Sequence, residues 1–154
     1  MITLAKIVCP IDFSEYSKHA LDYAVAIATQ YQSTLFLIHV VEPIRLPIDV
    51  GVGIPGLLEY EGTIVEKARE HLDALLDVTA RATLEVETHV LKGAAFAEIV
   101  RFARDKNADL IVIATHGLSG IAQLLLGSTA EKVVRKAPCP VLTVKHPEHQ
   151  FVMP

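Results

Sequence analysis

Hydrophobic positions along the chain fall into short continuous runs separated by longer stretches with helical spacing. Three runs are almost uninterrupted, as in strands buried on both faces of a parallel sheet: residues 4–11, 35–41 and 110–114. Residues 84–90 instead alternate between apolar and polar side chains, which indicates a strand with one solvated face near a sheet edge. Residues 140–145 form a last short run with strand character.

Four stretches between these runs place their apolar residues on one face of a helix. They lie at residues 20–31, 64–79, 96–103 and 130–137. Strict alternation of strand and helix predicts an α/β fold, with a doubly wound, three-layer arrangement of helices on both faces of a five-stranded parallel sheet. We expect one domain over residues 1–146 and a C-terminal tail at 147–154.

One connection, residues 42–56, is unusually long and contains three prolines and three glycines. Long loops inside compact domains are often lids or binding loops, but a variable surface connection explains the same composition. Both interpretations remain open from the sequence.

Charge and composition argue against several classes of function. The 154 residues carry a formal net charge of -4 and no basic run, which argues against binding nucleic acid through its phosphates. No apolar stretch approaches the roughly 18 residues of a membrane span, and no secretory signal precedes the first strand, so we expect a cytoplasmic protein. Cys9 and Cys139 each lie beside a proline in an apolar setting and are expected to be buried thiols.

Ligands of open α/β sheets bind outside the carboxyl ends of the strands, so the residues that follow each strand are the candidates. Asp12 follows the first strand, where a carboxylate can accept hydrogen bonds from ribose hydroxyls or help to hold a metal. The same residue, or Ser14, can equally cap the first helix. The sequence favours neither role of Asp12 over the other.

The stretch after the fourth strand carries the most chemical information. Gly117 and Gly120 let the backbone approach a ligand closely, and Gly127 then opens the last helix together with Ser128 and Thr129. Amide groups at a helix start form a phosphate site without a basic side chain. Ser128-x-x-Glu131 also reads as a capping box, which alone explains Ser128, but the preceding glycine loop favours the anion site.

His116, beside this loop, is the one candidate for acid–base catalysis, but no nucleophile or carboxylate is placed by sequence to act with it. A hydrogen bond that orients the loop is the favoured role. His39 ends a buried strand and is expected to be a core histidine. The chain has no GxxxxGK[ST], GxGxxG or GxSxG motif, and we predict no catalytic residue and no metal ligand.

The motif from Ala114 through Gly117, nine further residues and then Gly127-Ser128 resembles the Gly-x2-Gly-x9-Gly-Ser/Thr signature of the universal stress protein family. The run from Leu124 to Val134, followed by Ala137-Pro138-Cys139-Pro140-Val141-Leu142, is also similar to the C-terminal part of that family. Pro10-Ile11-Asp12-Phe13-Ser14 resembles its first strand end, so the similarity extends from the first strand to the last.

This resemblance implies a sheet of order 3-2-1-4-5 and an adenine-nucleotide site for ATP, with or without Mg²⁺. It also implies a homodimer that pairs through the last strand, Val141 to Val144. The family's binding positions correspond to Pro10, Asp12 and Val40 on the adenosine side, and to Ala114, Thr115, His116, Gly117, Gly120, Gly127, Ser128 and Thr129 on the phosphate side.

Two features depart from the family pattern. Ala114 replaces the first glycine, and residues 118–126 contain no charge where many family loops have Arg or Lys. The expected function is a regulatory ATP-binding homodimer of the stress response. A dimeric interaction protein without nucleotide is the alternative, and an ATPase, at most a slow one, has only Asp12 and His116 in its support.

Overall fold

The computed structural model describes residues 2–43, 56–117 and 126–147. Strands and helices alternate along the chain as the hydrophobic pattern predicts, except that two helices lie between the second and third strands. The elements are β1 (Lys6–Pro10), α1 (Glu15–Tyr31), β2 (Thr34–Val41), α2 (Leu57–Ala74), α3 (Val78–Thr83), β3 (Val86–Lys92), α4 (Ala95–Asp105), β4 (Leu110–Ala114), α5 (Ser128–Lys136) and β5 (Val141–Val144).

All five strands pair in parallel in the order β3-β2-β1-β4-β5, which confirms the predicted fold class and strand order. The chain winds outward from β1 to β3, then returns through α4 to place β4 on the other side of β1. Strand order therefore reverses between β1 and β4, and the connections that follow these two strands lead to helices on opposite faces of the sheet.

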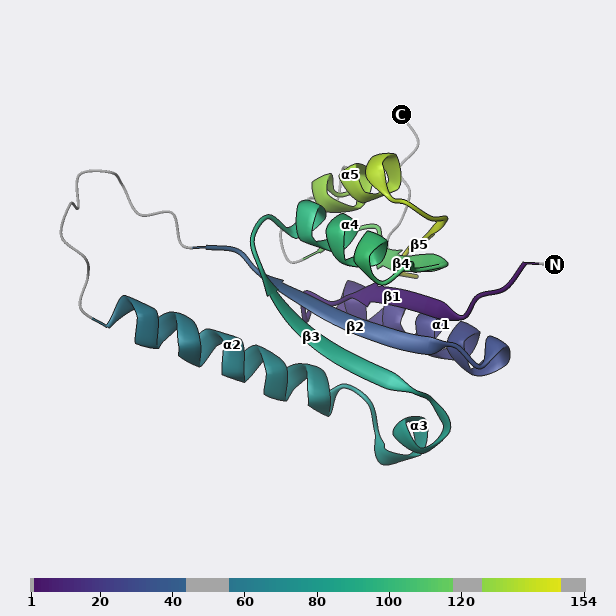
Figure 1. Cartoon of the computed structure of the whole chain (residues 1–154), viewed down its shortest axis with the longest axis horizontal. Coiled ribbons are helices and arrows are strands. Elements are labelled where there is room, and N and C mark those ends of the chain that lie inside the picture. The colour runs from purple at the N-terminus through teal and green to yellow at the C-terminus, as the bar shows by residue number, and fades with distance from the viewer. Residues whose placement is uncertain (1, 44–55, 118–125, 148–154) are drawn as a thin grey trace.

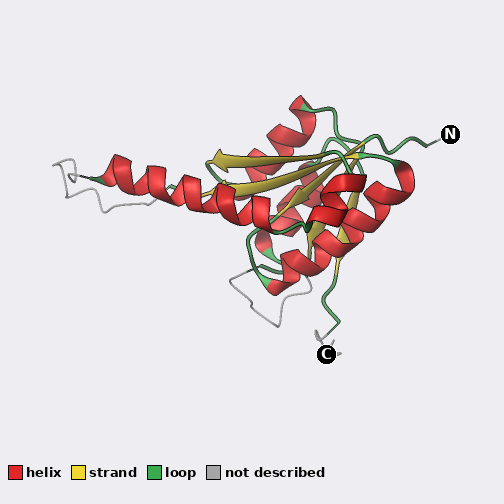
Figure 2. Cartoon of the chain, turned by 90° about the horizontal axis from the view of Figure 1, so that it is seen from below, coloured by secondary structure: helices red, strands yellow, loops and turns green. Residues whose placement is uncertain are grey.

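Helices cover both faces of the sheet (Figure 1; Figure 2 shows it from below). Helices α1 and α2 pack on one face, over a core that includes Ile7, Leu35, Leu72 and Val112. Helices α4 and α5 pack on the other face, over a second core that includes Val8, Phe36, Ile99, Ile111 and Val133. Neighbouring residues of one strand thus belong to opposite cores, as the period of two in a strand requires.

The two edges of the sheet are β3 and β5. β3 pairs only with β2, which confirms its predicted edge position, but its residues are half-buried from Val86 to Leu91, so burial does not alternate as the sequence pattern predicts. β5 forms the opposite edge and pairs with β4 from Val141 to Val144.

The helical pattern of residues 64–79 corresponds to two helices, which corrects the expectation of one. α2 ends at Ala74, and Asp77 then caps α3: its Oδ1 accepts a hydrogen bond from the Ala80 amide at 2.7 Å. Leu72 and Leu76 are both buried, so apolar spacing continues across the break while the backbone turns. Periodicity alone could not reveal the break.

Both cysteines are free thiols. Cys9 is buried in the core under α1 as expected, whereas Cys139 is only partly buried, beside the core under α4 and α5. Burial raises the pKa of the Cys9 thiol to about 12. Within the described residues, no helix is both long and apolar enough to cross a bilayer. Most of the long connection and the tail from residue 148 lie outside the described residues.

Replacing the cap residue Asp77 with Ala should lower the free energy of unfolding by about 1 kcal/mol, because the Ala80 amide loses its acceptor. For a chain of this length the loss corresponds to a fall of about 2–4 °C in melting temperature. Thermal unfolding followed by circular dichroism measures it. Asp77→Ser, which retains a capping oxygen, should recover most of the stability; equal melting temperatures for Asp77→Ala and the wild type would contradict the capping role.

Candidate functional site

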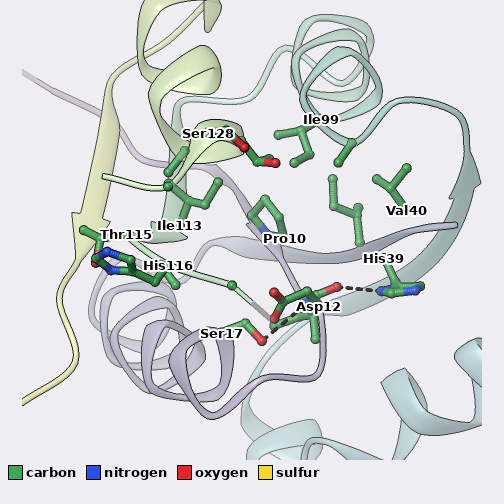
Figure 3. Close-up of a pocket in the computed structure, with 18 of the residues that line it drawn as sticks. Pro10, Asp12, Ser17, His39, Val40, Ile99, Ile113, Thr115, His116 and Ser128 are labelled. Carbon is green, nitrogen blue, oxygen red and sulfur yellow. Dashed lines mark hydrogen bonds between the residues drawn. The ribbon is translucent and has the colours of Figure 1, made fainter. Parts of the chain in front are cut away.

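A cavity of about 340 Å³ opens at the carboxyl ends of β1, β2 and β4, between the first turns of α4 and α5 (Figure 3). It lies where the strand order reverses, which is the position at which open α/β sheets bind ligands. Its size is at the lower end of the range for small-molecule sites, roughly 300–1,000 Å³.

One wall of the cavity is apolar. Ile38, Val40, Ile99 and Ile113 line it, and all four belong to or pack against the core under α4 and α5. Pro10 lies between Asp12 and Ser128 in the view of Figure 3. A flat apolar group of a ligand can therefore enter the cavity against side chains that the core already holds in place.

Asp12 lies on the opposite side and is held in a tight turn at the start of α1. Its Oδ1 accepts hydrogen bonds from the Ser14 amide at 3.0 Å and from the Ser14 hydroxyl at 2.5 Å. Ser14 is also the N-cap of α1, since its Oγ accepts from the Ser17 amide at 3.1 Å. The capping role weighed for Ser14 is therefore confirmed, and it leaves the Asp12 carboxylate at the cavity wall.

The backbone of Phe13 makes this turn possible. Its φ of 64° is left-handed, which is uncommon for a residue with a side chain. The Phe13 ring packs against His39, with ring centroids 4.6 Å apart, and against the edge of His71. These contacts fix the direction in which the chain leaves β1.

Gly117 lies directly beside the Asp12 carboxylate, so a side chain here would require that carboxylate to move. A Cβ at this position would lie 2.4 Å from Oδ2 of Asp12. The loop after β4 is thus in direct contact with the turn after β1, and the Asp12 carboxylate packs against the backbone of Gly117.

Gly127 joins the start of α5 to the end of β4. Its amide donates to the Thr115 carbonyl at 2.6 Å, and a Cβ there would lie 3.0 Å from the same oxygen. Gly127 is also the N-cap of α5, with no side-chain capping bond. The capping box of Ser128 and Glu131 does not form, because Ser128 is already the first helical residue and Glu131 pairs with Arg135 at 3.0 Å.

The backbone amides at the start of α5 are consequently available to a ligand in the cavity. The first N–H groups of an α-helix have no acceptor within the helix, and Ser128, Thr129 and Ala130 all line the cavity. The hydroxyls of Ser128 and Thr129 add two donors. Together with the helix dipole they form a local positive region in an acidic chain.

His116 is buried, and its ring is part of the loop's own structure. Its Nδ1 lies 3.0 Å from the Thr115 hydroxyl, and the ring packs against Tyr16 with centroids 5.9 Å apart. These contacts agree with the loop-orienting role favoured from sequence.

Ala114, the departure from the family signature, is 6% exposed and belongs to the core cluster under α1. Its methyl group therefore has a place within that core, although the residue also borders the cavity.

Ten of the eleven predicted site residues surround this one cavity: Pro10, Asp12, Val40, Ala114, Thr115, His116, Gly117, Gly127, Ser128 and Thr129. Gly120 lies outside the described residues. Among the described residues, no group of three or more His, Cys, Asp or Glu side chains is placed to hold a metal ion.

The sequence reading missed several lining residues. His39, expected in the core, is half-buried at the cavity and its Nδ1 donates to the Ile11 carbonyl at 2.7 Å. Glu42 follows β2, and its position after a strand was a usable signal. Ala95 and Ile99 come from α4, and only the packing of that helix over the strand ends brings them to the cavity.

Comparison with known proteins agrees with this geometry. The sequence model of the Universal stress protein family matches residues 3–145. This chain belongs to the universal stress protein family. It is 36% identical over 148 residues to a universal stress protein of Methanocaldococcus jannaschii, which covers 94% of this chain and 84% of the relative.

Solved structures show the same relationship for this universal stress protein. A second family member from M. jannaschii has a TM-score of 0.81 and 27% identity, covering 96% of this chain and 99% of that one. A universal stress protein solved in complex with cAMP has a TM-score of 0.65 and 27% identity, covering 91% of this chain and 96% of that one.

Gly117→Ala should destabilise this universal stress protein by about 1–3 kcal/mol, because the added methyl group displaces the Asp12 carboxylate. Urea unfolding measures the change. Gly62→Ala is the matched control: Gly62 is an exposed residue of α2 with nothing within 4 Å of an added Cβ, so this change should be neutral or stabilise by up to about 1 kcal/mol. Equal effects of the two substitutions would contradict the close contact.

Proposed function

We propose that this universal stress protein is a regulatory adenine-nucleotide-binding protein of the stress response, able to bind ATP and acting as a homodimer in the cytoplasm. The observation that carries the proposal is the cavity at the strand ends, which joins an apolar wall to a helix start without a side-chain cap. The cAMP complex of a related protein adds support for an adenine nucleotide as the ligand class. The two free thiols suit a reducing compartment.

In this proposal the adenine ring lies against the apolar wall around Val40 and Ile99, near Pro10, which also lines the cavity. Asp12 lies at the cavity wall, where its carboxylate can accept hydrogen bonds from the ribose hydroxyls. The turn at Phe13 holds Asp12 in this position before any ligand arrives.

The phosphate end of the nucleotide lies at the start of α5 in this proposal. The amides of Ser128 and Thr129, their hydroxyls and the helix dipole supply the attraction that a lysine supplies in other phosphate loops. In this proposal Mg²⁺ enters together with the phosphates of ATP.

The geometry supports binding more than turnover. Phosphoryl transfer needs a positioned base or water and groups that neutralise the developing charge. Of the two candidates, Asp12 is bonded to Ser14 and the His116 ring packs against Tyr16. We therefore assign the site a regulatory role.

Isothermal titration of the wild-type protein with adenine nucleotides should give a measurable heat, and Asp12→Asn should weaken binding by about tenfold, because hydrogen bonds to a charged acceptor contribute about 1.5–3 kcal/mol. Asp22→Asn, at an exposed position of α1, makes the same charge change away from the cavity and should bind like the wild type. Absence of heat with every adenine nucleotide would overturn the proposed function in favour of a nucleotide-free interaction protein.

The dimer is proposed from the open edge of β5. The carbonyl of Pro140 accepts from the amide of Ile111 in β4, and the carbonyl of Val144 accepts from the amide of Thr115, directly after β4, each at 3.0 Å. Alternate residues of a parallel strand bond to the same neighbour, so Val141 and Thr143 direct their backbone groups to the other side. An edge of this kind pairs readily with a second copy of itself.

Thr143→Pro should convert the dimer into a monomer, because proline removes an outward N–H and leaves the bonds to β4 intact. Light scattering after size exclusion gives the mass, and circular dichroism checks the fold. Thr143→Ala retains the N–H and should remain dimeric. A monomeric wild-type protein, or a dimeric Thr143→Pro variant, would contradict pairing through β5.

A further inference from the structure

The charged residues of the helices are divided unequally between the two faces of the sheet. Helices α4 and α5, which lie side by side on one face (Figure 1), carry five lysine or arginine residues and three carboxylates. Helices α1 and α2, on the other face, carry three lysine or arginine residues and seven carboxylates. The α4–α5 layer is therefore positive in a chain whose formal net charge is -4.

Two lysines of α5 lie over one aromatic ring of α4, and we call these three residues the Phe96 patch. Lys132 Nζ is 5.0 Å from the centroid of the Phe96 ring, and Lys136 Nζ is 5.7 Å from the same centroid. Both lysines are exposed, whereas Phe96 is half-buried. An ammonium group at this distance is attracted to the face of the ring. The ring therefore holds two positive charges close to one apolar surface.

The carboxylates of α4 and α5 do not neutralise these two lysines. Glu131 pairs with Arg135 at 3.0 Å, and Glu98 pairs with Arg101. The third carboxylate belongs to the last residue of α4, at the opposite end of that helix from the patch. Among the described residues, neither lysine of the patch is in a salt bridge. The patch thus presents two uncompensated ammonium groups beside an aromatic ring.

We propose that the Phe96 patch binds an acidic segment of a partner protein. A carboxylate of that segment lies between the two ammonium groups, and a neighbouring apolar side chain packs against the ring. Charge complementarity of this kind fixes the register of a partner and speeds its association. A segment with carboxylates also suits the size of the patch, because Glu98 and Glu131 flank it on the same two helices and would repel a broad anionic surface such as a membrane.

The patch adjoins the cavity without being part of it. Ala95 and Ser128 line the cavity, Phe96 follows Ala95 in α4, and Lys132 is one turn beyond Ser128 in α5. A partner on the patch therefore contacts both helices whose first turns border the cavity. The inference goes beyond the proposed nucleotide-binding function, and its test needs no nucleotide.

Fluorescence anisotropy of a labelled short peptide of alternating glutamate and leucine, titrated with the full-length protein, tests the proposal. The same peptide with glutamine in place of glutamate should bind at least about fivefold more weakly, because it lacks the carboxylates. A third peptide, with serine in place of leucine, should also bind more weakly, because it cannot cover the ring. Raising sodium chloride from about 0.05 M to about 0.5 M should weaken binding of the glutamate–leucine peptide, since exposed charges are screened.

A double substitution assigns the binding to the patch. Lys132→Gln combined with Lys136→Gln should weaken binding of the glutamate–leucine peptide about fivefold, since two exposed ion pairs are lost. Lys67→Gln combined with Arg69→Gln removes the same charge from exposed positions of α2 and should bind the peptide like the wild type. Circular dichroism verifies that both double variants are folded.

Three results would overturn the proposal: no binding of the glutamate–leucine peptide to the wild type, equal binding of the glutamate and glutamine peptides, or equal losses in the two double variants. Vesicles of phosphatidylcholine and phosphatidylserine provide a further test. If they bind the wild type and not the Lys132→Gln, Lys136→Gln variant, while the peptide binds neither, the patch is a membrane surface and the proposal is wrong. None of these results bears on nucleotide binding, which the calorimetric titration decides separately.

Discussion

The close contact between the end of β4 and the start of α5 is the constraint on which the site depends. The Gly127 amide donates to the Thr115 carbonyl at 2.6 Å, and Gly117 leaves no room for a side chain beside Asp12. These two contacts bring the Asp12 side chain, the loop after β4 and the start of α5 together. An added Cβ at either glycine would lie 3.0 Å or less from a neighbouring oxygen, so a substitution there requires a neighbour to shift.

The same constraint explains how an acidic chain can offer an anion site. With Gly127 as the N-cap, no side chain caps the first turn of α5, so the backbone amides of that turn remain directed at the cavity. At α1 and α4 the reverse holds, since Ser14 and Glu42 satisfy amides of those first turns. The positive potential is therefore local and arises from the backbone, which is why the net charge of -4 does not exclude it.

Most of the fold could be predicted from the sequence because the central strands are buried on both faces and therefore appear as continuous apolar runs. Most of the cavity could also be predicted, because ligands of such sheets bind at strand ends, where Asp12 and Gly117 lie. The break between α2 and α3 could not be predicted, because apolar spacing continues through Leu76 while Asp77 begins a new helix. The role of Ile99 could not be predicted either, since only the packing of α4 across the strand ends brings that residue to the site.

Thr115 connects the two parts of the proposed function. Its amide donates to the Val144 carbonyl of the edge strand, and its own carbonyl accepts from Gly127 at the helix start. Its hydroxyl also lies 3.0 Å from the His116 ring nitrogen, which fixes the peptide between the two bonds. In the proposed function the start of α5 holds a phosphate and β5 pairs with a second copy of the chain, and Thr115, which is buried, is bonded through its backbone to both elements.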